Sequence, residues 1–357
     1  VFEVSSSSTY SAATDDGTMV TFTGRATETL MHINSDNLAY ITEITYTPDG
    51  STQDYEPWRT GYLTAGTVTA SSSNTFTIAG TGSQIGRAIA ECYKGDYTAD
   101  GGGVNYISDH VDIDGWITGE DNYVKVYTPR SERHAGYLKN SGGNYAGFTI
   151  VDDADYISAI DIRERYTWIT GISFDDNGHI YYSRVYSKSR DSKITNNISA
   201  NKGNSKADIR LTQPNSIVYN NIIYNSGNIG IHIDDYGGHK IYNNTIVNCT
   251  TGIKDSTVYD SYRVKNNLCS NNSADYSGLT VNAIIEYNAS SDGTADDFGG
   301  TGNRVNQSFT FMDEANDDYR LAPDDEGAKN HGVDVSRDSS LPVVVRNDIE
   351  KDITGQT

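Results

Sequence analysis

Hydrophobic and polar residues alternate over many short runs of this chain, as in β-strands that bury one face. Residues 1–80 are rich in Thr and Ser, and they contain such runs at 18–23, 41–47 and 75–78. Short alternating runs of this kind are typical of strands joined by turns. The pattern therefore predicts a small β-rich N-terminal region over residues 1–80.

The pattern changes in residues 83–93. Here Ile85, Ala88, Ile89 and Cys92 follow the spacing i, i+3, i+4, i+7. This spacing places four apolar side chains on one face of a helix. The sequence predicts a short amphipathic helix, which we expect to cap the open end of the structure that follows.

An internal repeat is the strongest signal in the chain. The pattern Asn-Asn, three residues, Asn starts at Asn196, Asn220, Asn243 and Asn266, with spacings of 24, 23 and 23 residues. A degenerate fifth copy lies at 286–288. Four copies at nearly constant spacing indicate one structural unit repeated along an axis.

A second register runs in phase with the first. Ile209, Ile231 and Ile253 are each separated by 22 residues, and each lies in a short apolar run. Every repeat thus carries at least two short strands with turns between them. A repeat of this length suits one coil of a parallel β-solenoid, in which stacked coils build a continuous core. Residues 81–310 would then form about nine to eleven coils.

Asparagine suits the turns of such a solenoid because it tolerates left-handed backbone angles. Stacked amide side chains can also hydrogen-bond from one coil to the next, as they do in cross-β stacks. The repeat therefore predicts a structural ladder of Asn197, Asn221, Asn244 and Asn267.

The repeat resembles that of a known family. Asn-Asn-Ile-Ile-Tyr-Asn-Ser-Gly at 220–227, followed by Gly-Ile-His-Ile at 230–233, is similar to the right-handed parallel β-helix repeat of pectate-lyase-like proteins. Residues 166–174 look like an opening coil, and 311–323 with 352–356 look like the closing segment of secreted or phage-encoded members.

The resemblance implies an all-β, right-handed parallel β-helix over 81–310 and a C-terminal closing segment over 311–357. It implies no single activity, because this scaffold hosts lyases, hydrolases, epimerases, adhesins, phage tailspikes and structural proteins.

The net charge of the chain limits the kinds of molecule that it can bind. The 357 residues include 27 basic and 48 acidic side chains, for a net charge of −21. Such a chain repels a phosphate backbone, so we expect no nucleic-acid partner. No apolar run reaches the length of about 18 residues that spans a membrane. An acidic surface suits an extracellular protein, whether secreted, on a cell or on a virion. Three cysteines leave open whether Cys249 and Cys269 pair.

Alternation also defines a candidate site. With the three isoleucines inward, Arg210, His232 and Lys254 point outward on successive coils, about 5 Å apart. A lyase acting on a uronic acid needs a base and a cation that neutralises the carboxylate. Any of the three could be that base, and Asp234 with Asp235 could help to hold Ca²⁺, the one cofactor that the sequence suggests.

The same parity places Asp208 outward beside Asp234. However, the column lacks the three carboxylates of the Ca²⁺-dependent lyases of this fold, and no paired aspartates occur on adjacent coils. Solvated polar residues on an outer face need no catalytic role.

The sequence therefore favours a non-catalytic extracellular or virion-surface protein, structural or glycan-binding. Residues 1–80 have no evident role in the solenoid, so we expect them to contact other copies of the chain or a surface anchor. The alternative is a polysaccharide lyase or glycoside hydrolase that uses Arg210, His232 and Lys254.

Overall fold

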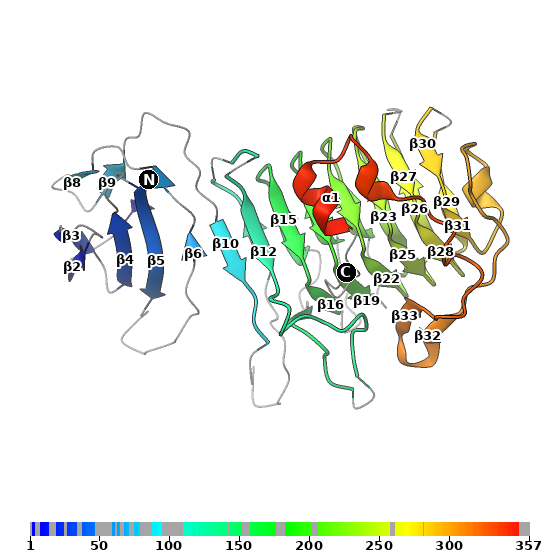
Figure 1. Ribbon diagram of the computed structural model, residues 1–357, viewed down its shortest axis with the longest axis horizontal. Coiled ribbons are helices and arrows are strands. Elements are labelled where there is room, and N and C mark those ends of the chain that lie inside the picture. The colour runs from blue at the N-terminus through cyan, green and yellow to red at the C-terminus, as the bar shows by residue number, and fades with distance from the viewer. Residues whose placement is uncertain are drawn as a thin grey trace. The chain divides into compact units, whose positions relative to one another are not determined.

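The protein is described here from a computed structural model (Figure 1). The structure describes strand segments between residues 2 and 78, and residues 88–94, 110–116, 118–120, 122–140, 143–151, 158–175, 183–200, 206–257, 261–280 and 282–349. The chain divides into two compact units, residues 1–91 with 117–126 and residues 92–116 with 127–357. The boundaries expected at residues 80 and 310 stay predictions.

Most strand pairs of the first unit are antiparallel, and its strands confirm the predicted β-rich N-terminal region. The three alternating runs fall on β3, β5 and β9. One sheet has the order β1-β9-β8, a second the order β4-β5-β7, and β2 pairs with β3. The strands are β1 (Phe2–Glu3), β2 (Ser8–Ala13), β3 (Met19–Gly24), β4 (Thr27–Ile33), β5 (Leu38–Tyr46), β6 (Arg59–Thr60), β7 (Leu63–Thr64), β8 (Val68–Ala70), β9 (Thr75–Ile78), β10 (Ala88–Glu91) and most of β12 (Val124–Tyr127).

The helix predicted at 83–93 is wrong. Strand β10 occupies Ala88–Glu91 and pairs antiparallel with β6, while residues 83–87 lie outside the described part of the chain. The Ala88 N–H donates to the Tyr123 carbonyl at 3.0 Å. A helix of about ten residues is marginal in isolation, so pairing with neighbouring strands outweighs the local periodicity.

The second unit is a parallel β-solenoid with three sheets, each named here after a central strand. The β20 sheet consists of β11 (Val111–Ile113), β14 (Ile160–Ile162), β17 (Ser183–Ser187), β20 (Ala207–Leu211), β23 (Ile229–Ile233), β26 (Thr251–Asp255) and β29 (Ala274–Ser277). The β21 sheet contains β15 (Thr167–Thr170), β18 (Lys193–Thr195), β21 (Ile217–Tyr219), β24 (Lys240–Tyr242), β27 (Arg263–Lys265) and β30 (Ile284–Glu286). The β22 sheet consists of β13 (Thr149–Val151), β16 (Ser173–Asp175), β19 (Ile198–Ala200), β22 (Ile222–Tyr224), β25 (Thr245–Val247), β28 (Leu268–Ser270) and β31 (Ala289–Ser290).

The solenoid has fewer coils than the nine to eleven predicted. The β20 and β22 sheets each have seven strands among the described residues. The first coil is long, because Val111 pairs with Ile160, about two repeat lengths further on. Dividing residues 81–310 by the repeat length therefore overestimates the number of coils.

The interior is built from stacked residues of successive coils. Ile209 pairs with Ile231, and Ile231 pairs with Ile253, all three buried. At the corner between the β21 and β22 sheets, each buried asparagine accepts with Oδ1 from the backbone N–H and the Nδ2 of the asparagine one coil earlier. The two distances are 3.0 and 3.1 Å for Asn197 to Asn221, 3.0 and 2.9 Å for Asn221 to Asn244, and 3.1 and 3.0 Å for Asn244 to Asn267.

Each ladder asparagine also donates across the corner to the β21-sheet strand of the previous coil. The Nδ2 of Asn244 lies 3.0 Å from the Val218 carbonyl, for example. The ladder continues through Asn288 and Asn303. The residue before each ladder position, such as Asn220 with φ 56° or Asn243 with φ 54°, takes the left-handed conformation that turns the chain.

The C-terminal segment folds back along the solenoid (Figure 1). It contains β32 (Phe311–Asp313), which pairs with β33 (Asp318–Leu321), and α1 (Val343–Ile349), the only α-helix in the described part of the chain. Short 3-10 helices lie at η2 (Thr294–Asp296), η3 (Glu314–Asn316) and η4 (Val335–Arg337). Residues 352–356, which resemble a family ending, lie outside the described residues.

This segment covers the outer faces of two sheets. On the β21 sheet, Tyr219 and Tyr242 pack in an apolar cluster with Leu341 and Val345. On the β22 sheet, outward residues such as Tyr224 pack with Tyr319 of β33 and with side chains of the loop before β13. Within the described residues, the outer face of the β20 sheet has no comparable apolar cover.

We predict that Asn244→Leu lowers the free energy of unfolding by about 1–3 kcal/mol, because it leaves the buried donors of Asn221 without an acceptor. The measurement is equilibrium urea unfolding followed by circular dichroism. The control is Asn271→Gly, at an exposed position with φ 55°, where we expect a change of about 0.5 kcal/mol or less. Equal midpoints for Asn244→Leu and wild type would contradict a stabilising ladder.

Candidate functional site

The outer face of the β20 sheet carries the predicted candidates in one column. Parallel pairing places Asp161 beside Tyr186, Tyr186 beside Arg210, Arg210 beside His232, and His232 beside Lys254. We call these five residues and their contacts the open face. The sequence prediction that Arg210, His232 and Lys254 lie next to one another on successive coils is therefore correct.

Arg210 is held by two neighbours. Its Nε donates to Asp234 Oδ2 at 2.9 Å, and a second guanidinium nitrogen binds the same oxygen. The guanidinium also lies over the Tyr186 ring, 4.8 Å from the centroid. An arginine neutralised in this way remains protonated and cannot serve as a base. It is available for recognition through its remaining N–H groups.

Tyr186 joins two cations and was missed by sequence reasoning. The Lys188 Nζ lies 4.4 Å from the ring centroid, and Lys188 also forms an ion pair with Asp161. The ring, Lys188 and Arg210 together form a preformed cationic and aromatic surface. The signal that could have found Tyr186 is its position one repeat length, 24 residues, before Arg210.

His232 is nearly buried and neutral at pH 7. Its Nε2 lies 2.9 Å from Ser256 Oγ and 3.5 Å from Asp234 Oδ1. Burial lowers the pKa of His232 to about 4; Asp234 raises it, and Lys254 and Arg210 lower it. The imidazole is thus an uncharged hydrogen-bonding group between two cations.

Lys254 differs from the other two. Its side chain is partly exposed and makes no hydrogen bond or ion pair with any residue that the structure describes. It pairs through the backbone with Ser277 on the next coil, so the column ends in a small polar residue. Lys254 is therefore a cation available to an anionic group from solution.

The two aspartates proposed for Ca²⁺ have different surroundings. Asp234 contacts Arg210 and His232, whereas Asp235 is exposed and accepts from the Tyr236 N–H at 2.9 Å. Among the described residues, no three His, Cys, Asp or Glu side chains are grouped so as to hold a metal ion. The Ca²⁺ site stays a prediction.

The expected outward position of Asp208 is wrong. This residue is fully buried and accepts a hydrogen bond from Ser199 Oγ on the β22 sheet. Asp208 is the second residue of its strand, and the first three residues of that strand are all buried. At the equivalent position one coil on, a Cβ on Gly230 would lie only 2.6 Å from Ile246 Cγ2 in the core. Strict alternation therefore fails at this position.

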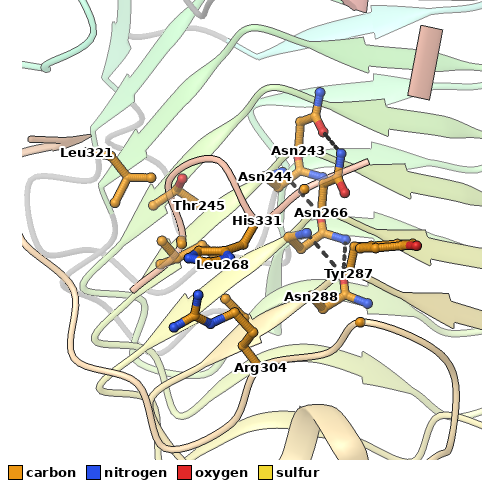
Figure 2. Close-up of a pocket in the computed structure, with 15 residues that line it drawn as sticks. Asn243, Asn244, Thr245, Asn266, Leu268, Tyr287, Asn288, Arg304, Leu321 and His331 are labelled. Atoms are coloured by element: carbon orange, nitrogen blue, oxygen red, sulfur yellow. Dashed lines mark hydrogen bonds between the residues drawn. The ribbon is translucent and has the colours of Figure 1, made fainter. Parts of the chain in front are cut away.

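A small cavity of about 210 Å³ lies between the asparagine turns and the C-terminal segment (Figure 2). Asn266 closes it, because its Nδ2 donates to the Val333 carbonyl at 2.7 Å and its Oδ1 accepts from the Val333 N–H at 2.9 Å. Arg304, which points into this region, is bound to Gln307 at 2.7 Å. The polar groups here hold the segment on the solenoid.

The three cysteines are not bridged. Cys249 and Cys269 are buried, and burial raises the pKa of both thiols. They pack as apolar core residues, so the pairing left open by the sequence does not occur.

Comparison of the chain with known protein families, curated proteins and solved structures found no match. No helix in the described residues is long and apolar enough to cross a membrane.

We predict that the protein loses stability as the pH falls from about 6.5 to about 4. Burial lowers the pKa of His134 to about 3 and those of His232 and His239 to about 4, from 6.5. In this window the unfolded chain binds protons that the folded chain does not, which favours unfolding.

Urea unfolding at pH 7.5 and at pH 4.5 measures this effect. His232→Gln keeps a partner for Ser256 and removes one titrating group, so we expect a smaller loss of stability than in wild type. A stability that is constant or rises as the pH falls would contradict the assignment of neutral buried histidines.

Proposed function

We propose that this chain is a non-catalytic β-solenoid of the pectate-lyase-like type that binds an acidic glycan on its open face. We further propose that it works outside the cell or on a virion surface. The observation that carries this proposal is that side chains of the open face hold one another in place across neighbouring coils. Asp234 neutralises Arg210, and Arg210 stacks on Tyr186. Groups fixed in this way form a surface prepared for binding.

The charge pattern supports an anionic ligand. The whole chain carries a net charge of −21, yet the open face presents Lys188, Arg210 and Lys254 close together. Of these three cations, Lys254 alone has no counter-ion among the described residues. Tyr186 holds two of these cations, Lys188 and Arg210, against its ring.

A polysaccharide lyase remains the second candidate, on the strength of one observation. His232 is neutral and lies beside Lys254, so an imidazole able to accept a proton adjoins a cation able to neutralise a carboxylate. Against it, the Nε2 of His232 is engaged with Ser256 and Asp234.

The N-terminal strands support a role in assembly. Short antiparallel sheets leave edge strands, and edges of this kind recruit other chains. We propose that residues 1–80 contact another copy of the chain or a surface anchor.

We predict that the wild-type protein is retarded in affinity electrophoresis by polygalacturonate and releases no unsaturated products from it. Lys254→Gln should weaken this retardation about threefold to tenfold through loss of one partly exposed charge. The control is Lys329→Gln in the C-terminal segment, which should bind as wild type. Equal retardation of all three proteins would contradict binding at the open face.

Product release by the wild type would favour the lyase instead. In that case His232→Ala and Lys254→Ala should each abolish release in a protein that circular dichroism shows to be folded.

For assembly, we predict that deletion of residues 1–80 leaves a folded solenoid that has lost its oligomeric state or its attachment. Light scattering of the full chain and the truncated chain tests this. An unchanged oligomeric state in a folded truncated protein would refute the proposal.

A further inference from the structure

A second cavity, of about 380 Å³, lies in the solenoid unit away from the open face. It opens where the turns that leave the β20 sheet reach the first residues of β24, β27 and β30. Small-molecule sites typically have volumes of about 300–1,000 Å³, so this cavity can hold one monosaccharide. It is lined by Asn215, Gly238, His239, Lys240, Ser261, Tyr262, Arg263, Asn282, Ile284 and Ser340.

Two cations lie side by side in this cavity. Lys240 and Arg263 pair directly on neighbouring parallel strands, which lie about 4.8 Å apart. Arg263 Nη1 is 3.7 Å from Asp338 Oδ2, and Lys265 shares that carboxylate at 3.8 Å. Lys240 forms no ion pair with any described residue.

This cation pair is incompletely neutralised. Burial and the nearby Arg263 lower the pKa of Lys240, while Asp338 and Asp191 raise it. A lysine whose charged form is disfavoured by burial and a neighbouring cation is stabilised when an anion binds beside it. The arrangement is unusual on a chain with a net charge of −21.

His239 adds a hydrogen-bond acceptor. Its side chain is fully buried, and its Nε2 lies 3.4 Å from the Asp235 carbonyl, which can only accept. The neutral ring therefore carries its proton on Nε2 and a lone pair on Nδ1. That Nδ1 is buried and has no hydrogen-bond partner in the structure. Because the His239 side chain is closed to solvent, a ligand hydroxyl group reaches Nδ1 only when the ring turns toward the cavity, where the hydroxyl supplies the missing donor.

We propose that this cavity binds a sugar acid, with its carboxylate between Lys240 and Arg263 and a hydroxyl group donating to His239. A simple oxyanion would neutralise the two cations but leave the His239 acceptor without a donor. A neutral sugar would supply that donor but leave the two cations without a counter-ion. The inference does not rest on the proposed function, because no residue of the cavity belongs to the open face.

Isothermal titration calorimetry of the full chain tests the proposal with D-glucuronate, D-glucose and sulfate as probes. We expect D-glucuronate to bind at least tenfold more tightly than either D-glucose or sulfate. Lys240→Gln and Arg263→Gln should each weaken D-glucuronate binding at least tenfold. The matched control is Lys193→Gln, in the same strand position two coils earlier but outside the cavity, which should bind as wild type.

Circular dichroism establishes that each variant is folded. If Lys240→Gln fails to fold, Lys240→Arg keeps the charge and should retain D-glucuronate binding to within about threefold. The proposal is overturned if D-glucuronate does not bind or if both glutamine variants bind it as wild type. Equal affinity for sulfate would overturn the assignment to a sugar acid.

Discussion

The rest of the structure depends on the buried asparagine ladder at the corner between the β21 and β22 sheets. Each coil must turn there without water, and a turn exposes backbone groups that cost free energy when buried unpaired. Asn221 shows the solution, since its Oδ1 accepts twice from Asn197 of the preceding coil. Its Nδ2 donates to the Ile194 and Tyr219 carbonyls and to Asn244 Oδ1 of the next coil. Because most of these hydrogen bonds join one coil to its neighbour, the ladder fixes coil register and spacing together.

Fixed register in turn creates the open face. Since coils stack residue on residue, side chains far apart in the sequence become neighbours on adjacent strands, as Tyr186, Arg210 and His232 do. The C-terminal segment then decides which outer face remains for binding. It places Leu341 and Val345 over the β21 sheet and Tyr319 over the β22 sheet, and neither cluster reaches the β20 sheet.

The repeat made much of this predictable, because each copy occupies the same environment and its spacing is the coil length. The ladder residues and the column of Arg210, His232 and Lys254 follow from that spacing alone. The failures have local causes. The helix expected at 83–93 rested on one short hydrophobic period, which strand pairing outweighs. Asp208 lies near the start of its strand, where inward and outward residues do not alternate strictly. The C-terminal segment covers the β21 and β22 sheets through packing between residues that are distant in the sequence. A repeat pattern within the sequence does not predict such packing.

The ion pairs of the open face were also beyond sequence reasoning. Asp234 was assigned to a metal, yet its carboxylate lies against Arg210 from the preceding coil. The alternation of side chains along a strand predicts the face of the sheet on which a side chain lies. It does not predict which neighbouring residue a long side chain contacts. The same limit applies to Lys240 and Arg263, whose pairing follows from register but whose cavity depends on the turns around it.

The central claim is that one outer face of the solenoid is open while the other two are covered. Nitration of tyrosines by tetranitromethane, mapped by mass spectrometry, tests it most directly. The account predicts that Tyr186 is modified in the native protein, that Tyr219 and Tyr224 are protected, and that polygalacturonate protects Tyr186 as well. Modification of Tyr219 and Tyr224 as fast as that of Tyr186 would contradict it.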